Sequence, residues 1–151
     1  NLQGDEPLMP AALIARVADT LKSDKQAVVA TACVSIQNPE QINDPNVVKV
    51  VTDQNGHALY FSRAAIPFLR DAASELEHRV FRHIGIYAYR CGFLMEFTQL
   101  PPSSLEQVEA LEQLRVLWYG GKIAVLETSD DPGHGVDTPD DLQRVRDLLE
   151  S

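Results

Sequence analysis

Two aspartates lie in loops where the sequence could support metal-assisted chemistry. Asp5 follows a short strand-like stretch at residues 2–3, and Asp137 lies just before a predicted helix. Ligands of α/β sheets gather beyond the carboxyl ends of strands, and Mg²⁺ takes only one or two protein carboxylates together with substrate phosphates. Two such loops are compatible with a magnesium site. The alternatives are that Asp5 is a turn residue bonding its own backbone and that Asp137 is an extra helix-terminal charge.

Four polar residues further along the chain could converge on a hydroxylated ligand. His83 begins a predicted strand whose alternate positions include Tyr87, and Glu112 and Gln113 fall near the middle of a predicted helix. Imidazole, phenol, carboxylate and amide groups can together donate to and accept from several hydroxyls. The alternatives are a hydrogen-bonded histidine at a strand start for His83, and a solvated helix face for Glu112 and Gln113.

Two arginines near the end of a predicted hairpin, Arg63 and Arg70, could hold a carboxylate by bidentate pairing. The alternative is that they only balance the acidic surface. The sequence contains no glycine-rich phosphate loop, no G-x-S-x-G and no H-E-x-x-H. Those motifs therefore assign no chemistry to this chain.

Alternating strands and helices must position these residues. A proline at residue 10 opens a helix that runs to about residue 22, and an Asn-Gly pair marks a hairpin turn. Ser103 and Glu106 form a capping box ahead of a single helix that ends at a glycine pair. The remaining expectations are strands at 28–36, 47–52, 57–62, 83–89 and 122–127 and helices at 92–98 and from 138 onward. We expect a loop or a short turn of helix at 37–46, a surface loop carrying a helical turn at 64–82, and a loop at 128–135. This order predicts an α/β fold with a largely parallel sheet flanked by helices and an appended antiparallel hairpin.

Composition limits the class of protein. The chain has 151 residues, 44% of them hydrophobic, and a formal net charge of −9. That charge disfavours nucleic acid and anionic lipid as partners, and no apolar run approaches the roughly 20 residues of a membrane-spanning helix. Two cysteines, Cys33 and Cys91, are too few for a disulfide scaffold. We therefore expect one folding unit in a reducing, cytoplasmic setting.

Five motifs in sequence order resemble a known family. They are LQGDEP at 2–7, ALYFSR at 58–63 with Ile-Pro at 66–67, HIGIY at 83–87, LEQLR at 111–115 and GVDTP at 135–139. Together they resemble the 3-deoxy-manno-octulosonate (KDO) cytidylyltransferases, the CMP-KDO synthetases of Gram-negative bacteria, over essentially the whole chain. The resemblance implies a Rossmann-like fold of the nucleotide-diphospho-sugar transferase type.

The resemblance also implies a reaction and a site. The substrates would be CTP and KDO, and the products CMP-KDO and pyrophosphate for lipopolysaccharide biosynthesis, with the sugar's anomeric hydroxyl attacking the α-phosphate. By motif match, Asp5 and Asp137 are the catalytic Mg²⁺ ligands. The residues matched to the KDO pocket are Gln3, His83, Tyr87, Glu112 and Gln113, while Arg70 and Arg63 would face the sugar carboxylate.

The family's N-terminal portion, which holds the triphosphate and the cytosine, has no counterpart in this sequence. Roughly a hundred residues, about one mononucleotide-binding half, would supply it. We therefore expect residues 1–151 to be the sugar-binding and dimerisation portion of a single cytidylyltransferase domain, with the N-terminal part of the fold absent and little CTP binding by the chain alone. The hairpin region 47–62 is the expected homodimer interface. The alternatives are a catalytically silent sugar-binding module and a cytidylyltransferase for another keto-sugar acid.

Overall fold

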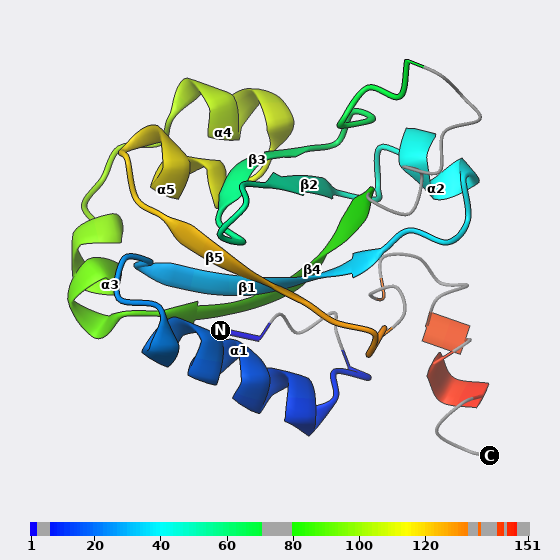
Figure 1. The fold of residues 1–151 in the computed structure, drawn as a ribbon, viewed down its shortest axis with the longest axis horizontal. Coiled ribbons are helices and arrows are strands. Elements are labelled where there is room, and N and C mark those ends of the chain that lie inside the picture. The colour runs from blue at the N-terminus through cyan, green and yellow to red at the C-terminus, as the bar shows by residue number, and fades with distance from the viewer. Residues whose placement is uncertain (3–6, 71–79, 133–135, 137–141, 144, 148–151) are drawn as a thin grey trace.

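A computed structural model describes residues 1–2, 7–70, 80–132, 136, 142–143 and 145–147. Its strands form one mixed sheet in the order β3-β2-β4-β1-β5, with helices on both faces (Figure 1). The strands are β1 (Val29–Ser35), β2 (Lys49–Thr52), β3 (Ala58–Ser62), β4 (Phe81–Tyr89) and β5 (Ile123–Glu127). The helices are α1 (Ala11–Ser23), α2 (Glu40–Asn43), α3 (Cys91–Phe97), α4 (Ser104–Glu109) and α5 (Leu114–Trp118).

Helix α1 covers one face of the sheet. Pro10 precedes it with φ −65°, the value that proline presets for a helix start. Its buried side chains Leu13, Val17 and Leu21 recur every four residues, so they form one apolar stripe. That stripe packs on the small and branched residues of β1, β4 and β5, namely Ala30, Ala32, Ile84, Ile86 and Ala124. The predicted helix from residue 10 is confirmed.

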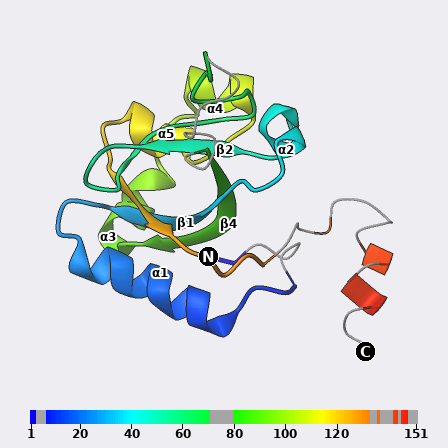
Figure 2. The same cartoon turned by 45° about the vertical axis from the view of Figure 1, so that its right-hand side comes forward.

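The β2–β3 hairpin continues the sheet next to β4 and curves back over the face opposite α1, so that it lies above β1 and β4 (Figure 2). Gly56 adopts φ 78° in the turn, where a residue with a Cβ would be strained. The tip is held at two points: Val125 N of β5 donates to Gly56 O at 2.8 Å, and His57 Nε2 lies 2.6 Å from Asp24 Oδ2 at the end of α1. Phe61 points inward from β3 and is fully buried. The predicted hairpin is confirmed.

The strand directions differ from the expectation, although the α/β class with flanking helices is confirmed. Only β1 and β5 are parallel among the described strands; β4 pairs antiparallel with β1 and β2, and β3 pairs antiparallel with β2. The expectation of a largely parallel sheet assumed that every strand follows a helical crossover. Instead β4 inserts between β2 and β1, so the sheet is mixed.

The single helix expected after residue 103 is also corrected, because it is two short helices. The capping box is present: Ser103 Oγ accepts from Glu106 N, and Ser103 N donates to the Glu106 carboxylate. Helix α4 ends where Ala110 adopts the left-handed φ of 51°. Leu111 is then buried while Val108 is 84% exposed. The break turns residues 111–113 into a linker that faces the sheet.

Candidate functional site

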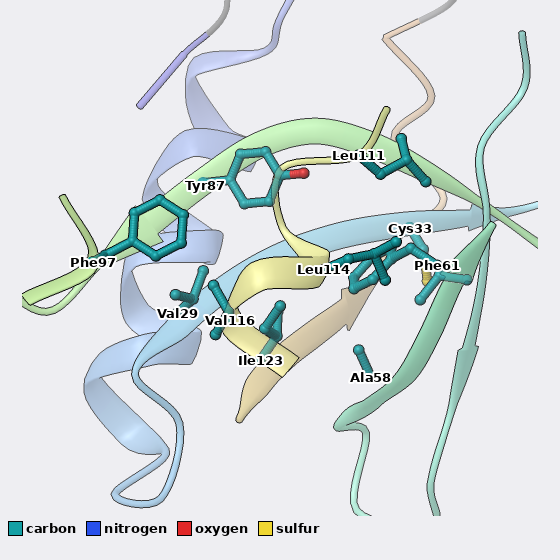
Figure 3. Close-up of a cluster of buried hydrophobic side chains, with 11 residues drawn as sticks. Val29, Cys33, Ala58, Phe61, Tyr87, Phe97, Leu111, Leu114, Val116 and Ile123 are labelled. Atoms are coloured by element: carbon teal, nitrogen blue, oxygen red, sulfur yellow. The ribbon is translucent and has the colours of Figure 1, made fainter. Parts of the chain in front are cut away.

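Strand β4 carries aromatic side chains along the face opposite α1. Alternation along the strand places His83, Tyr87 and Tyr89 on that face. The ring centroids of His83 and Tyr87 are 5.4 Å apart, and Phe61 of the hairpin meets His83 edge-on at 5.1 Å. Figure 3 shows the Tyr87 hydroxyl directed toward Leu111, in the linker between α4 and α5. The site therefore lies between β4, the hairpin and this linker.

His83 is held in one orientation by Thr31. Thr31 Oγ1 lies 2.9 Å from His83 Nε2 and donates its single proton to a backbone carbonyl, the shorter contact being Ile86 O at 2.7 Å. The hydroxyl oxygen must therefore accept from His83 Nε2–H, which assigns the tautomer and leaves Nδ1 as an acceptor. Burial, together with the charge of the neighbouring Arg82, lowers the pKa of His83 to about 3. The ring is thus neutral near pH 7.

Tyr87 presents a hydroxyl that stays protonated. Burial raises its pKa well above 10, and the nearby Tyr89 and Glu112 add to the shift. No described residue forms a hydrogen bond with the Tyr87 hydroxyl, so it is available as a donor. Its backbone is paired with the start of the chain: Tyr87 N donates to Asn1 O at 3.0 Å. Leu2 bridges to Ile86 in the same way, as its strand-like sequence predicted.

The linker between α4 and α5 brings two more of the predicted residues to this face. Gln113 is only 6% exposed and lies between Leu111 and Leu114, which belong to the same core cluster as Tyr87. Within the described part of the chain its side-chain amide has no hydrogen-bond partner. Glu112 is 73% exposed and sits 3.9 Å from Arg115 Nη2. Gln113 therefore does not belong to a solvated helix face, whereas Glu112 does remain exposed.

The two predicted arginines have different surroundings. Arg63 Nε donates to Glu109 O at 2.9 Å, and its Nη1 donates to Pro45 O at 3.0 Å. Most of this guanidinium is therefore committed to the protein's own backbone. Arg70 is exposed and forms no ion pair or hydrogen bond with any residue that the structure describes. Arg70 is the freer of the two for an external carboxylate.

The predicted magnesium ligands, Asp5 and Asp137, lie outside the described residues, as does Gln3. Among the residues that are described, no group of three His, Cys, Asp or Glu side chains is arranged to hold a metal. The magnesium site remains a prediction from the sequence. No helix within the same ranges is long and apolar enough to cross a membrane. Cys33 and Cys91 are both free thiols.

Two residues of this region were not expected from the sequence. Thr31, which orients His83, is a fully buried hydroxyl inside an otherwise apolar strand, and that single polar interruption was the available signal. Glu109, which accepts from Ser62 Oγ at 2.7 Å and Arg63 N at 3.0 Å, carried no signal in its local sequence. Its partners come from a hairpin that is more than forty residues away in the chain.

Comparison with known proteins identifies the family of the chain. A family model described as Cytidylyltransferase matches residues 1–123. Curated 3-deoxy-manno-octulosonate cytidylyltransferases from Polynucleobacter necessarius and Aeromonas hydrophila are each 56% identical over 99% of this chain. A solved structure titled as CMP:2-keto-3-deoxy-manno-octonic acid synthetase complexed with CTP is 42% identical over 99% of this chain, with a TM-score of 0.89. The chain spans 59% and 60% of the lengths of those two relatives and 60% of the solved chain.

Proposed function

The chain belongs to the cytidylyltransferase family, and from that premise we propose that it forms the sugar-acid side of an enzyme that transfers a cytidylyl group from CTP to KDO. The relatives named for this activity support the proposal, since they are 56% identical over nearly the whole chain. The products would be pyrophosphate and CMP-KDO, and CMP-KDO would feed lipopolysaccharide biosynthesis. Because CTP is a cytoplasmic nucleotide, the proposed location is the cytoplasm.

The reaction is a substitution at the α-phosphorus of CTP. The anomeric hydroxyl oxygen of KDO forms the new bond to phosphorus and loses its proton, while the bond to the bridging oxygen breaks and pyrophosphate leaves. Asp5 and Asp137 would hold Mg²⁺, which when bound neutralises charge on the triphosphate. The remaining work is positioning, which dominates phosphoryl-type transfer.

The observation that carries the proposal is that one face of the sheet presents hydrogen-bonding groups with no hydrogen-bond partner among the described residues. His83 Nδ1 is an acceptor, the Tyr87 hydroxyl is a donor, and the Gln113 amide offers both. Glu112 adds an acceptor carboxylate that lies close enough to raise the pKa of Tyr87. A ligand rich in hydroxyls satisfies all four. We propose that Gln3 completes this pocket and that Arg70, with the remaining Nη2 of Arg63, meets the KDO carboxylate.

The test measures KDO binding by calorimetry and pyrophosphate release with CTP, KDO and Mg²⁺ in the full-length protein. Gln113→Ala should weaken KDO binding about tenfold, because it removes two hydrogen bonds from a buried site. Gln107→Ala is the matched control, since Gln107 is exposed on α4. Unchanged KDO binding by Gln113→Ala would contradict the assignment of this pocket.

The same assay separates the alternatives. KDO binding without pyrophosphate release would favour a catalytically silent sugar-binding module. Faster release with another keto-sugar acid would favour a related cytidylyltransferase, because pocket hydrogen bonds discriminate strongly between hydroxyl patterns.

We propose further that the protein is a homodimer formed through the hairpin region 47–62. Two observations support this: β3 is an edge strand of the described sheet, and Leu59 on β3 is 62% exposed. An edge strand with an apolar side chain is prone to pair with another copy. Leu59→Lys should convert the dimer to a monomer in light scattering, while Val108→Lys, at an 84% exposed position on α4, should not. A dimer that survives Leu59→Lys would contradict the interface.

A further inference from the structure

Glu109 joins the end of α4 to the end of β3. One carboxylate oxygen, Oε1, accepts from Ser62 Oγ at 2.7 Å and lies 3.4 Å from the Tyr60 hydroxyl. The other, Oε2, accepts from Arg63 N at 3.0 Å. The Glu109 carbonyl oxygen also accepts from Arg63 Nε at 2.9 Å. Glu109, the last residue of α4, therefore makes four polar contacts with three residues at the end of the hairpin, namely Tyr60, Ser62 and Arg63.

The hairpin segment that binds Glu109 is itself held in place by Lys49 of β2. Lys49 is fully buried, and its ammonium donates to the carbonyl oxygens of Asp44, Val47 and Arg63. All three ammonium protons are thus used. The positive charge also lies close enough to Glu109 to interact with its carboxylate. Because Arg63 is hydrogen-bonded to both Lys49 and Glu109, the end of β3 fixes the position of the end of α4.

The same stretch of β3 contacts the other half of the pocket. Phe61 immediately precedes Ser62, is fully buried and meets the His83 ring edge-on with centroids 5.1 Å apart. On the α4 side, the chain leaves Glu109 through the left-handed residue Ala110 and reaches Gln113 four residues later. The hairpin therefore touches β4 through Phe61 and the end of α4, just before the linker, through Glu109.

We propose that Glu109 is a positioning residue of the sugar-acid pocket: by tying the end of α4 to β3, it sets where Gln113 lies relative to His83. This inference rests on the proposed function. We assign Glu109 a positioning role and not a substrate-binding one, because its carboxylate already accepts from Ser62 and Arg63. Loss of its charge should loosen the linker and weaken contacts to the sugar, while contacts to CTP stay as they are.

The test is Glu109→Gln in the full-length protein, with steady-state kinetics varied separately in KDO and CTP and with KDO binding measured by calorimetry. The amide of the variant keeps the size of the side chain but turns one acceptor into a donor that faces Ser62 or Arg63. We expect the KM and Kd for KDO to rise about tenfold, which corresponds to about 1.4 kcal/mol. The KM for CTP should stay within about twofold, because the variant weakens binding of the sugar and leaves the contacts to CTP as they are.

A second variant keeps the test decisive if Glu109→Gln folds poorly. Ser62→Ala removes the shortest hydrogen bond to Glu109 and should raise the KM for KDO about threefold. Glu96→Gln, at an exposed position on α3, is the control that should change nothing. A purely structural role would lower the melting temperature of both variants without moving the KM for KDO, and that result would overturn the inference.

Different results would overturn the proposed function and the positioning role of Glu109. Wild-type protein that does not bind KDO would overturn the proposed function, and the positioning role with it. Wild-type protein that binds KDO, with Glu109→Gln binding it equally tightly, would overturn the positioning role alone. A rise in the KM for CTP equal to that for KDO would also overturn it.

Discussion

The partly buried, neutral ring of His83 predicts a loss of stability on mild acidification that a single substitution should remove. Burial lowers the pKa of His83 to about 3, whereas the ordinary value in an unfolded chain is 6.5. As pH falls below 6.5, the unfolded chain binds the proton first. The contribution of His83 to folding is therefore complete above pH 6.5 and is lost progressively toward pH 3.

The size of the effect follows from the two pKa values. Between pH 7.5 and pH 5 the unfolded histidine becomes almost fully protonated, while the folded one stays neutral. Linkage then gives a loss of about 2 kcal/mol from this one group, out of a typical total of about 5–15 kcal/mol. His83→Gln retains a donor for Thr31 Oγ1 but cannot titrate, so it should lack this component.

The assay is urea unfolding of wild type and His83→Gln at pH 7.5 and pH 5. Carboxylates titrate in both proteins and cancel in the comparison. Wild type should lose about 2 kcal/mol more than the variant. The ¹⁵N shifts of the His83 ring should also report an Nε2–H tautomer that persists at pH 5. Equal losses in the two proteins, or a ring that titrates near pH 6.5, would refute the reasoning.

Three further predictions concern other residues. Arg115→Met should cost about 3 kcal/mol in urea unfolding, because Arg115 forms two hydrogen bonds to the Glu106 carboxylate and lies 4.7 Å from the Phe97 ring centroid; a loss under about 1 kcal/mol would mean that the pair behaves as an exposed one. Burial raises the pKa of Cys33 to about 12, so Ellman's reagent at pH 8 should modify one thiol, the exposed Cys91, in native protein and both only in denaturant; rapid reaction of both thiols would contradict the burial of Cys33. Asp137→Asn in the full-length protein should abolish pyrophosphate release and leave the far-ultraviolet circular dichroism unchanged, whereas retained activity would remove Asp137 from the proposed metal site.

Local chemistry made several elements predictable from the sequence. Proline at residue 10 fixes the backbone for a helix start, and glycine at residue 56 supplies the positive φ of the hairpin turn. Ser103 and Glu106 satisfy each other's backbone donors at the start of α4. Each of these signals acts within four residues, so the local structure that it predicts does not depend on contacts with distant parts of the chain.

The sheet order and the break at Ala110 depended on distant contacts, so the sequence could not supply them. The apolar spacing of Leu111 and Leu114 is equally compatible with one helix or two, and alanine favours helix. The break is stabilised by Leu111 N, which donates to Glu106 O, and by the contacts of Glu109 with β3. Likewise β4 reaches its place between β2 and β1 through pairings that no local pattern encodes.

The proposed pocket residues also divide into those that the local sequence predicts and those that depend on distant contacts. His83 and Tyr87 could be placed together, because alternation along one strand puts residues four apart on the same face. Residue type made Gln113 a candidate, but its burial could not be predicted, because that burial follows from the break in the helix. Arg63 was expected to meet the sugar, yet two of its guanidinium nitrogens bind backbone carbonyls. These hydrogen bonds form only in the folded protein, so the local sequence does not indicate them.

The charges around the proposed pocket also constrain how KDO would enter it. Glu112 is an anion beside Tyr87 and Tyr89, and it raises the pKa of both hydroxyls. A sugar carboxylate placed beside Glu112 would be repelled, because like charges at short range cost free energy. The carboxylate must therefore point away from Glu112 and toward an arginine such as Arg70, while the hydroxyls face the neutral His83. A keto-sugar acid in which the carboxylate is replaced by a neutral amide should lose the contribution of Arg70 and keep that of Gln113, so Arg70→Ala should weaken binding of the acid much more than binding of the amide.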